Sequence, residues 1–291
     1  MLALLGPGDT AVVADPAFQI HTTAVVLAGA STVSVPLGND DDFLDRIDMV
    51  LDSMQPQPKL VILCYPHNPT AMTVDDDFFP KVVELCRRHG VMVINDFAYG
   101  ETCFDGYKAP SLLQAEGAKE FGVELTTLSK PYNMAGWRIG FCCGNAKMID
   151  GLATVKDYYD YGSFQSVQIA AIIAMREGDK HSDAQNLKYA ARRDILVKEL
   201  RKLGWEVDSP QASMFLWAKV NPEHLARFNG SSDEFCVSMV EQAEVAMTPG
   251  AAFGPRGEGY VRLALVENEQ RIRQAMRNLN RVLNKPAPAV G

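Results

Sequence analysis

Polar side chains of different chemistry occur at the ends of short β-rich segments of this chain. The segment 126–130, TTLSK, ends in a lysine, and Arg138 follows in a stretch with almost no other charge. Asp96 ends the segment VIND, and Arg262 lies inside the apolar segment GYVRLAL. Singly, such residues cap helices, make turns or stay solvated. Together they supply an amine, a carboxylate and two guanidinium groups, which can hold and react with a charged small molecule.

Strand and helix patterns alternate through the first half of the chain. Segments rich in β-branched residues recur between residues 11 and 143, and most alternate with amphipathic helical patterns such as DFLDRIDMVLDSM and FFPKVVELCRRHG, the latter ending at Gly90. This alternation predicts an α/β fold with a mostly parallel, three-layer sheet domain, whose chemistry gathers in loops at the carboxyl ends of the strands.

The second half of the chain has a different pattern. A long amphipathic helix is expected from Ser182, as its N-cap, to Gly204, followed by short strands and a final helix through RIRQAMRNLNRVL. We therefore expect a large domain over 1–180, a smaller α+β domain over 181–283 and a disordered tail over 284–291.

Composition excludes several classes of protein. The chain has 291 residues, 47% of them hydrophobic, and a net charge of −8, which suits an enzyme for small molecules and argues against nucleic-acid or acidic-membrane partners. The first apolar stretch stops at Gly6 without a basic leader, so it predicts neither a signal peptide nor a membrane span. The six cysteines have no C-x-x-C spacing, which favours a cytoplasmic protein.

Metal binding and serine hydrolysis are not indicated. The acidic triplets 40–42 and 75–77 each open a predicted helix, where carboxylates cap free N–H groups and favour the helix dipole. The five histidines lack paired ligand spacing, and no G-x-S-x-G motif is present. We therefore expect no metal site.

The polar set meets the needs of pyridoxal 5'-phosphate, which requires a lysine for its aldehyde, a carboxylate for its ring nitrogen and cationic or hydroxyl donors for its phosphate. The chain resembles the fold-type I, class I/II aminotransferases up to about residue 282. The motifs NPT, ND-x-x-Y, LSK-x-x-x-x-x-G-x-R-x-G and VRLAL stand in that family's order. Several segments, among them SKPYNMAGWRIGF, look most like bacterial alanine-forming (glutamate–pyruvate) transaminases.

The resemblance implies a role for each residue of the set. Lys130 would bind the cofactor covalently and act as the catalytic base, while Asp96 would hold the ring nitrogen protonated. Arg262 would clamp the α-carboxylate of the substrate, since a guanidinium matches a carboxylate in a two-bond fork. The other implied contacts are with the phosphate (Ser129 and Arg138), the ring hydroxyl (Tyr99 and Asn68, the latter also near the substrate) and the ring face (Phe18).

The resemblance therefore implies ping-pong transfer of an amino group between an amino acid, of the alanine and glutamate type, and a 2-oxo acid. Three alternatives stay open: an LL-diaminopimelate aminotransferase, a carbon–sulfur lyase of the same fold, and a catalytically impaired fragment. Arg138, the arginine expected to bind the phosphate, is also the positive charge expected to lower the pKa of Lys130.

Two further expectations follow from the resemblance. Family active sites take groups from both subunits, so a homodimer is expected, with Tyr159–Phe164 as the segment that reaches the neighbour's cofactor. The resemblance also begins in mid-domain, without the family's N-terminal part. From this we expect that the chain alone binds the cofactor weakly and turns over little.

Overall fold

The computed structural model describes residues 1–38 and 40–284. Within these residues, six strands form one sheet in the order β2-β1-β3-β4-β5-β6, and four strands form a second sheet in the order β7-β8-β10-β9. The first unit contains β1 (Thr10–Asp15), α1 (Gln19–Leu27), β2 (Ser31–Pro36), α2 (Asp40–Ser53), β3 (Leu60–Leu63), α3 (Phe78–His89), β4 (Met92–Asp96), α4 (Ala118–Phe121), β5 (Gly122–Thr127), β6 (Gly140–Gly144) and α5 (Ala146–Tyr159).

The six-stranded sheet is mostly parallel. Strands β1 to β5 pair in parallel, and β6 pairs antiparallel with β5 at one edge. Parallel pairing requires a crossover between successive strands, which the intervening helices supply. The predicted α/β class is confirmed.

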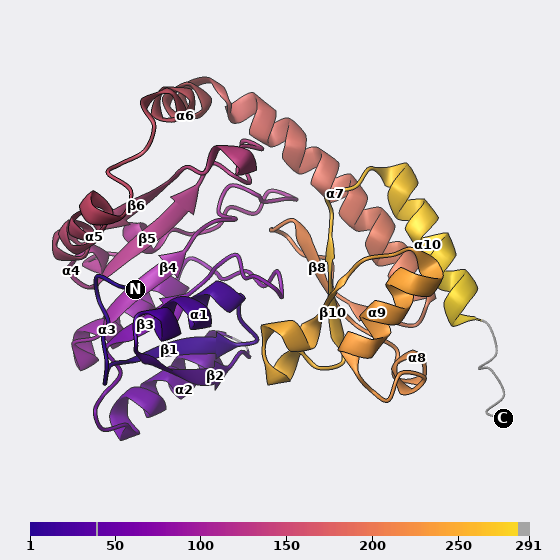
Figure 1. The fold of residues 1–291 in the computed structure, drawn as a ribbon, viewed down its shortest axis with the longest axis horizontal. Coiled ribbons are helices and arrows are strands. Elements are labelled where there is room, and N and C mark those ends of the chain that lie inside the picture. Colours follow the sequence, from indigo (N-terminus) through magenta and orange to yellow (C-terminus); the bar gives the residue numbers. More distant parts are fainter. Residues whose placement is uncertain (39, 285–291) are drawn as a thin grey trace.

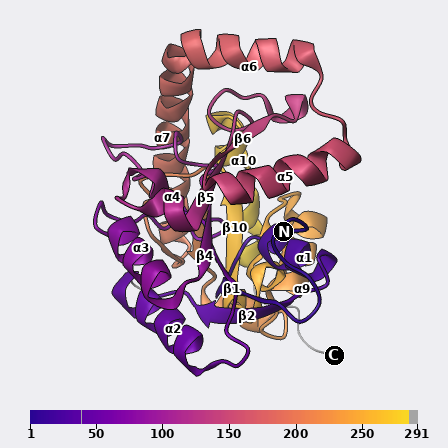
Figure 2. The same cartoon turned by 90° about the vertical axis from the view of Figure 1, so that its left-hand side faces the viewer.

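Helices cover both faces of this sheet. Along β3, Leu60 and Ile62 join one buried cluster with Val25 of α1 and Met148 of α5, whereas Val61 joins the cluster under α2 and α3. Successive residues of a strand point to opposite faces, so a β3 that is buried on both sides must be apolar throughout. Figure 2 shows α2 and α3 on one side of the sheet and α1 and α5 on the other.

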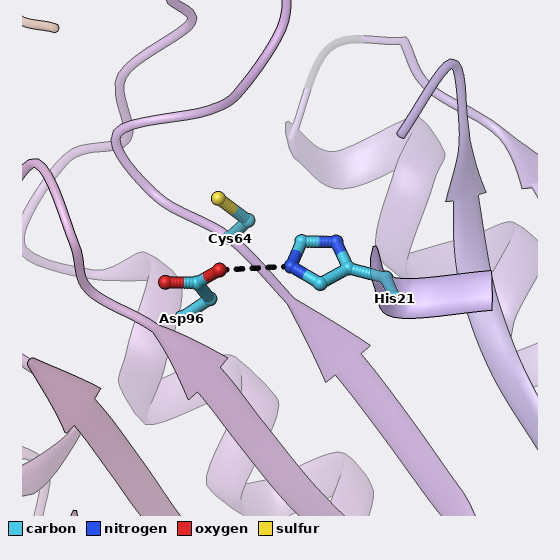
Figure 3. Close-up of side chains that lie close together, drawn as sticks. All are labelled: His21, Cys64 and Asp96. Atoms are coloured by element: carbon cyan, nitrogen blue, oxygen red, sulfur yellow. Dashed lines mark hydrogen bonds and ion pairs between the residues drawn. The ribbon is translucent and has the colours of Figure 1, made fainter. Parts of the chain in front are cut away.

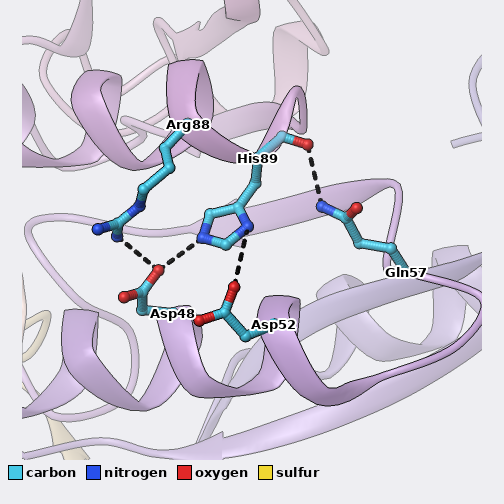
Figure 4. A network of polar contacts seen from close by, with 5 residues as sticks. All are labelled: Asp48, Asp52, Gln57, Arg88 and His89. Atoms are coloured by element: carbon cyan, nitrogen blue, oxygen red, sulfur yellow. Dashed lines mark hydrogen bonds and ion pairs between the residues drawn. The ribbon is translucent and has the colours of Figure 1, made fainter.

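Helices α2 and α3 are tied together at their exposed ends by the polar network in Figure 4. Asp48 Oδ1 of α2 accepts from Arg88 Nη2 at 2.5 Å and lies 2.6 Å from His89 Nε2, and Gln57 Nε2 donates to the His89 carbonyl at 3.0 Å. Gly90 ends α3 with φ of 65°, a left-handed conformation that glycine adopts without strain, as the sequence predicted.

The second unit is a smaller α+β assembly, on the right of Figure 1, as expected. Its antiparallel sheet packs against α7, α9 and α10 around one buried cluster that includes Leu200, Leu216, Phe235 and Leu279. Its elements, with the helix that precedes it, are α6 (Gln165–Glu177), α7 (Asp179–Lys202), β7 (Glu206–Val207), β8 (Phe215–Lys219), α8 (Pro222–Ala226), α9 (Ser232–Ala243), β9 (Thr248–Pro249), β10 (Tyr260–Ala264) and α10 (Glu269–Leu283).

Some local predictions were wrong. The long helix begins at Asp179 with Gly178 as its N-cap, so Ser182 lies inside it and is buried rather than capping it. An acidic residue in the first turn favours this earlier start, because it faces the positive end of the helix dipole. Asp77 precedes α3 but makes no side-chain cap; its carboxylate pairs with Lys81 at 2.8 Å instead.

The expected domain boundaries stay predictions. A single helix, α7, runs across the expected boundary between residues 180 and 181 and connects the two units in Figure 1. Of the predicted tail, Asn284 is the C-cap of α10, and residues 285–291 lie outside the described residues. No helix in the described ranges is long and apolar enough to cross a membrane.

Candidate active site

The residues singled out in the sequence converge where the carboxyl ends of β3, β4 and β5 face the second sheet. Side chains of the two units are in contact there. The ring of Tyr99 meets Phe215 of β8 edge-on at 5.7 Å, and Arg262 Nη1 of β10 donates to Asn68 Oδ1 at 2.8 Å. The site therefore lies between the two units, so each must be correctly placed for it to form.

Lys130 follows β5 and is half-buried. Its Nζ lies 5.9 Å from the centre of the Tyr99 ring. Burial lowers the pKa of Lys130 most, and the positive charges of Arg262 and then Arg138 lower it further, against the opposing effect of Asp96. The direction expected from the sequence is confirmed, although Arg262 contributes more than Arg138. A lowered pKa increases the fraction of neutral amine, the form that acts as a nucleophile or base.

Asp96 is the last residue of β4, and both of its carboxylate oxygens have partners. Oδ1 accepts from the Ala98 backbone N–H at 3.2 Å, and Oδ2 lies 2.9 Å from His21 Nε2. His21 is buried on the first turn of α1. His21 was not among the predicted site residues, although it lies three residues after Phe18 at a helix start, and residues with this spacing share one helix face.

Phe18 and Tyr99 provide the aromatic surface of the site. Phe18 is the N-cap residue of α1, and its ring contacts His21 edge-on at 5.8 Å. Tyr99 is buried, and this burial raises the pKa of its hydroxyl above the usual value, which keeps the group protonated and able to donate. Tyr99 thus lies beside the amine of Lys130, and Phe18 packs against His21, the partner of Asp96.

Arg262 is held by aromatic rings rather than by a carboxylate. Its guanidinium carbon lies 4.1 Å from the ring centre of Phe215 and 4.6 Å from that of Phe253. Within residues 1–38 and 40–284 no carboxylate forms an ion pair with it, and Asn68 accepts a hydrogen bond from Nη1. A guanidinium has five N–H donors, so most of them remain open to an incoming carboxylate.

Arg138 and Ser129 lie on the loops at the β6 end of the site. The sequence placed Arg138 at a strand start, which is wrong: it follows the 3₁₀ turn Ala135–Trp137 with φ of 52°, and β6 begins at Gly140. Its Nη1 donates to the Ala135 carbonyl at 2.9 Å, and the side chain is exposed. The Ser129 hydroxyl oxygen accepts from Thr127 Oγ1 at 3.0 Å. Both side chains keep unused donors.

A second histidine that the sequence analysis passed over holds the NPT loop. His67 is buried, and burial lowers its pKa to about 3, so it is neutral at ordinary pH. Its Nδ1 lies 2.7 Å from Thr70 Oγ1. A neutral imidazole in this position fixes the loop that carries Asn68 without adding charge beside Arg262.

This donor set fits pyridoxal phosphate. The site combines an amine with a lowered pKa, a carboxylate whose ion-pair partner among the described residues is His21, and exposed guanidinium and hydroxyl donors. These are the groups that an aldehyde, a pyridine nitrogen and a phosphate require. In this arrangement Lys130, Asp96 and Arg138 with Ser129 would hold the three parts of the cofactor.

We predict that Arg262→Gln raises the pKa of Lys130, because it removes the positive charge that lowers this pKa most. Arg138→Gln should raise it by less. Reductive ¹³C-methylation of the cofactor-free protein, followed by an NMR pH titration, would measure both. The exposed Lys147 serves as the internal control. A Lys130 signal that titrated together with that of Lys147 would contradict the assignment.

The chain is similar in sequence to known aminotransferases. The sequence pattern of the family described as aminotransferase class I and II matches residues 1–279. The chain is 46% identical over 280 residues to the glutamate-pyruvate aminotransferase AlaC of Escherichia coli, covering 96% of this chain and 67% of that protein. It is 39% identical to the LL-diaminopimelate aminotransferase of Moorella thermoacetica, covering 98% of this chain and 71% of that protein.

Solved structures agree with the sequence comparison. Substrate-bound BacF from Bacillus subtilis superposes with a TM-score of 0.90 at 30% identity, covering 100% of this chain and 72% of that one. An N-succinyldiaminopimelate aminotransferase from Mycobacterium tuberculosis superposes with a TM-score of 0.87 at 28% identity, covering 97% and 73%. The chain therefore belongs to the aminotransferase class I and II family, the pyridoxal phosphate-dependent transaminases.

Proposed function

We propose that this transaminase exchanges amino groups between the alanine–pyruvate and glutamate–2-oxoglutarate pairs, with Lys130 as its catalytic residue. The observation that carries the proposal is the meeting of Lys130, Asp96 and Arg262 at one interface between the units. The three charges influence one another, since Asp96 and Arg262 both shift the pKa of Lys130. The choice of substrate pair is supported by the 46% identity to a glutamate-pyruvate aminotransferase.

The roles of the residues follow from their chemistry. Bound pyridoxal phosphate supplies an aldehyde that takes up the amino group and a ring that accepts electrons from the substrate α-carbon. Lys130 Nζ, once neutral, can accept the proton from the α-carbon and return it. Asp96 keeps a negative charge opposite the ring nitrogen, and its hydrogen bonds from Ala98 N–H and with His21 hold that carboxylate in place.

The remaining residues position the reactants. Tyr99 and Asn68 would donate to the ring hydroxyl oxygen, and Phe18 would pack on the ring face. Arg138 and Ser129 would bind the phosphate. Asn68 also contacts Arg262, so the group that clamps the substrate carboxylate is linked to the loop that borders the cofactor.

A homodimer belongs to this proposal. Exposed apolar side chains gather on α5, α6 and the turn between them, and Tyr161 in that turn is 90% exposed. Contiguous apolar surface of this kind marks an interaction site. A second copy of the chain would cover it, with Tyr159–Phe164 reaching towards the partner's site. The side chains are Tyr158, Tyr159, Tyr161, Phe164, Ile169, Ile172 and Ile173.

A cytoplasmic location is part of the same proposal. All six cysteines are free, and Cys143 is exposed, which agrees with a reducing compartment.

Purified protein supplied with an excess of pyridoxal phosphate is expected to form detectable amounts of pyruvate and glutamate from alanine and 2-oxoglutarate. Lys130→Ala should abolish this activity and the borohydride-fixed attachment of the cofactor, because it removes the amine that lies beside Tyr99 and Arg262. The matched control Lys147→Ala changes an exposed lysine outside the site and should retain both.

Two further arms of this assay separate the alternatives. Faster turnover of LL-diaminopimelate than of alanine would favour the diaminopimelate function, and pyruvate release from a cysteine conjugate without any oxo acid would favour a lyase. Cofactor fixed to a lysine other than Lys130 in the peptide map would overturn the site assignment.

Arg262→Lys is expected to raise the KM for both the amino acid and the oxo acid, by roughly tenfold or more, because lysine keeps the charge but loses the two-bond fork. Steady-state kinetics with each substrate varied in turn would measure it. Arg277→Lys is a suitable control, since Arg277 is an exposed arginine on α10 of the same unit. Unchanged kinetics for Arg262→Lys would show that another group binds the carboxylate.

The wild-type chain is expected to sediment as a dimer, and Ile172→Asp with Ile173→Asp should shift it towards monomer, since two charges would then be buried in the interface. Val237→Asp is the control, because Val237 is 60% exposed on α9 of the other unit. Sedimentation velocity over a range of concentrations makes the comparison. A wild-type monomer with full turnover would contradict the proposed dimer.

A further inference from the structure

Three side chains with different metal-binding atoms meet at the floor of the site: His21, Cys64 and Asp96. Their potential ligand atoms all lie within 4.8 Å of one another, and His21 Nε2 and Asp96 Oδ2 are 2.9 Å apart. Figure 3 shows the His21 imidazole facing the Asp96 carboxylate, with Cys64 beside them; the Cys64 thiol donates to the Pro66 carbonyl at 3.7 Å. We call these three residues the His–Cys–Asp cluster.

The backbone holds the cluster firmly. Strands β3 and β4 pair with Leu63 opposite Asn95, so the next residues, Cys64 and Asp96, leave neighbouring strand ends side by side. Residues at matching positions of paired strands point to the same face. Helix α1 then brings His21 over that face, and the histidine and cysteine are both buried.

The donors match a thiolate-preferring divalent cation such as Zn²⁺. Zinc binds sulfur at about 2.3 Å and nitrogen or oxygen at about 2.0–2.2 Å, and sites with three protein ligands keep a fourth position for water or another ligand. Tetrahedral bonds of these lengths place ligand atoms roughly 3.3–3.8 Å apart. The separations between the ligand atoms of the cluster run from 2.9 Å to at most 4.8 Å and so bracket that range. Small side-chain rotations would complete the tetrahedral geometry.

The charges also balance. A thiolate and a carboxylate neutralise a divalent cation, so the filled cluster carries no net charge, whereas the empty cluster carries the single negative charge of Asp96. Binding transfers the Cys64 thiol proton to solvent and moves the imidazole proton from Nε2 to Nδ1, freeing the nitrogen that faces the carboxylate. Because burial and Asp96 raise the pKa of the Cys64 thiol, releasing its proton opposes metal binding. The free energy gained from the metal–sulfur bond must therefore exceed the free energy of deprotonating Cys64.

We propose that the cofactor-free protein binds Zn²⁺ through His21 Nε2, Cys64 Sγ and a carboxylate oxygen of Asp96, and that the metal and pyridoxal phosphate exclude each other. The exclusion rests on the proposed role of Asp96 at the ring nitrogen, whereas metal binding itself does not. Zinc bound at the cluster would hold the enzyme in a cofactor-free, inactive form. The sequence predicted no metal site because the three ligands are far apart along the chain.

Cobalt(II) is the spectroscopic probe for this site, since it takes the same ligands as zinc and reports on them. Titration of the cofactor-free protein should produce a sulfur-to-cobalt charge-transfer band together with intense visible bands of a tetrahedral ion, and equimolar Zn²⁺ should remove both. Cys64→Ser should lose the charge-transfer band and bind zinc at least about tenfold more weakly. His21→Gln should weaken binding while keeping the sulfur band.

Cys143→Ser is the matched control, because Cys143 is exposed and lies outside the cluster next to Cys142, where adventitious metal would bind. The band should persist in this variant. Persistence of the band in Cys64→Ser, or its loss in Cys143→Ser, would overturn the proposal. Circular dichroism of each variant confirms that it has folded, and His21→Gln tests the site independently if Cys64→Ser does not fold.

Competition distinguishes the two parts of the proposal. Protein loaded with pyridoxal phosphate should show no cobalt band, and added Zn²⁺ should slow the reappearance of the cofactor absorbance in the stripped protein. A cobalt band of equal intensity with and without the cofactor would refute mutual exclusion but leave the metal site. Normal transamination with no metal binding would refute the metal site and leave the proposed function intact.

Discussion

The parallel register of β3, β4 and β5 is the constraint on which the rest of the site depends. Hydrogen bonds pair Leu63 with Asn95 and Asp96 with Leu125, so the strands end together and release Cys64, Asp96 and the loop with Lys130 at one edge. A slip of one residue in any of these strands would turn its side chains to the opposite face. Helices pack on both faces of β3, so such a shift would disrupt the packing of Leu60 and Ile62 against α1 and α5 and of Val61 against α2 and α3.

Charge is distributed around this edge so that one amine is destabilised in its protonated form. Arg262 and Arg138 lower the pKa of Lys130, and burial acts in the same direction. The two arginines tolerate this crowding for different reasons. Arg262 lies between the rings of Phe215 and Phe253, whose faces attract a cation, and Arg138 is exposed to solvent. The site thus gathers positive charge without a carboxylate that would neutralise it at Arg262, and a substrate carboxylate can take that position.

The second unit contributes Arg262, the proposed substrate clamp, and its placement also depends on the first unit. Arg262 reaches Asn68 on the NPT loop, and that loop is held by the neutral, buried His67. Loss of either support would leave the guanidinium correctly charged but misplaced. The His–Cys–Asp cluster lies under the same region. Asp96 is therefore proposed to bind two different cations: the protonated ring nitrogen of the cofactor, or a metal ion when the cofactor is absent.

Local pattern in the sequence was sufficient for much of this structure. The alternation of β-rich and amphipathic segments, the stop at Gly90 and the polar residues at strand ends are properties of neighbours along the chain. They determined the α/β class, the position of most elements and the identity of Lys130, Asp96 and Arg262 as members of one set. Helix ends were less predictable. The start of α7 at Asp179 rather than near Ser182 is an example, because Gly178, Asp179 and Ser182 are all residue types that commonly begin helices.

Tertiary structure alone decided which distant groups touch. The pairing of His21 with Asp96, the approach of Cys64 to both, and the hydrogen bond from Arg262 to Asn68 join residues from different strands, helices and units. Such contacts depend on strand register and on how the two units pack, neither of which is encoded in any local spacing. For the same reason the sequence assigned the lowered pKa of Lys130 to Arg138, the arginine nearby in the chain. The fold gives the larger share to Arg262, which is remote in sequence but acts on the same amine across the interface, because electrostatic interaction follows distance in space.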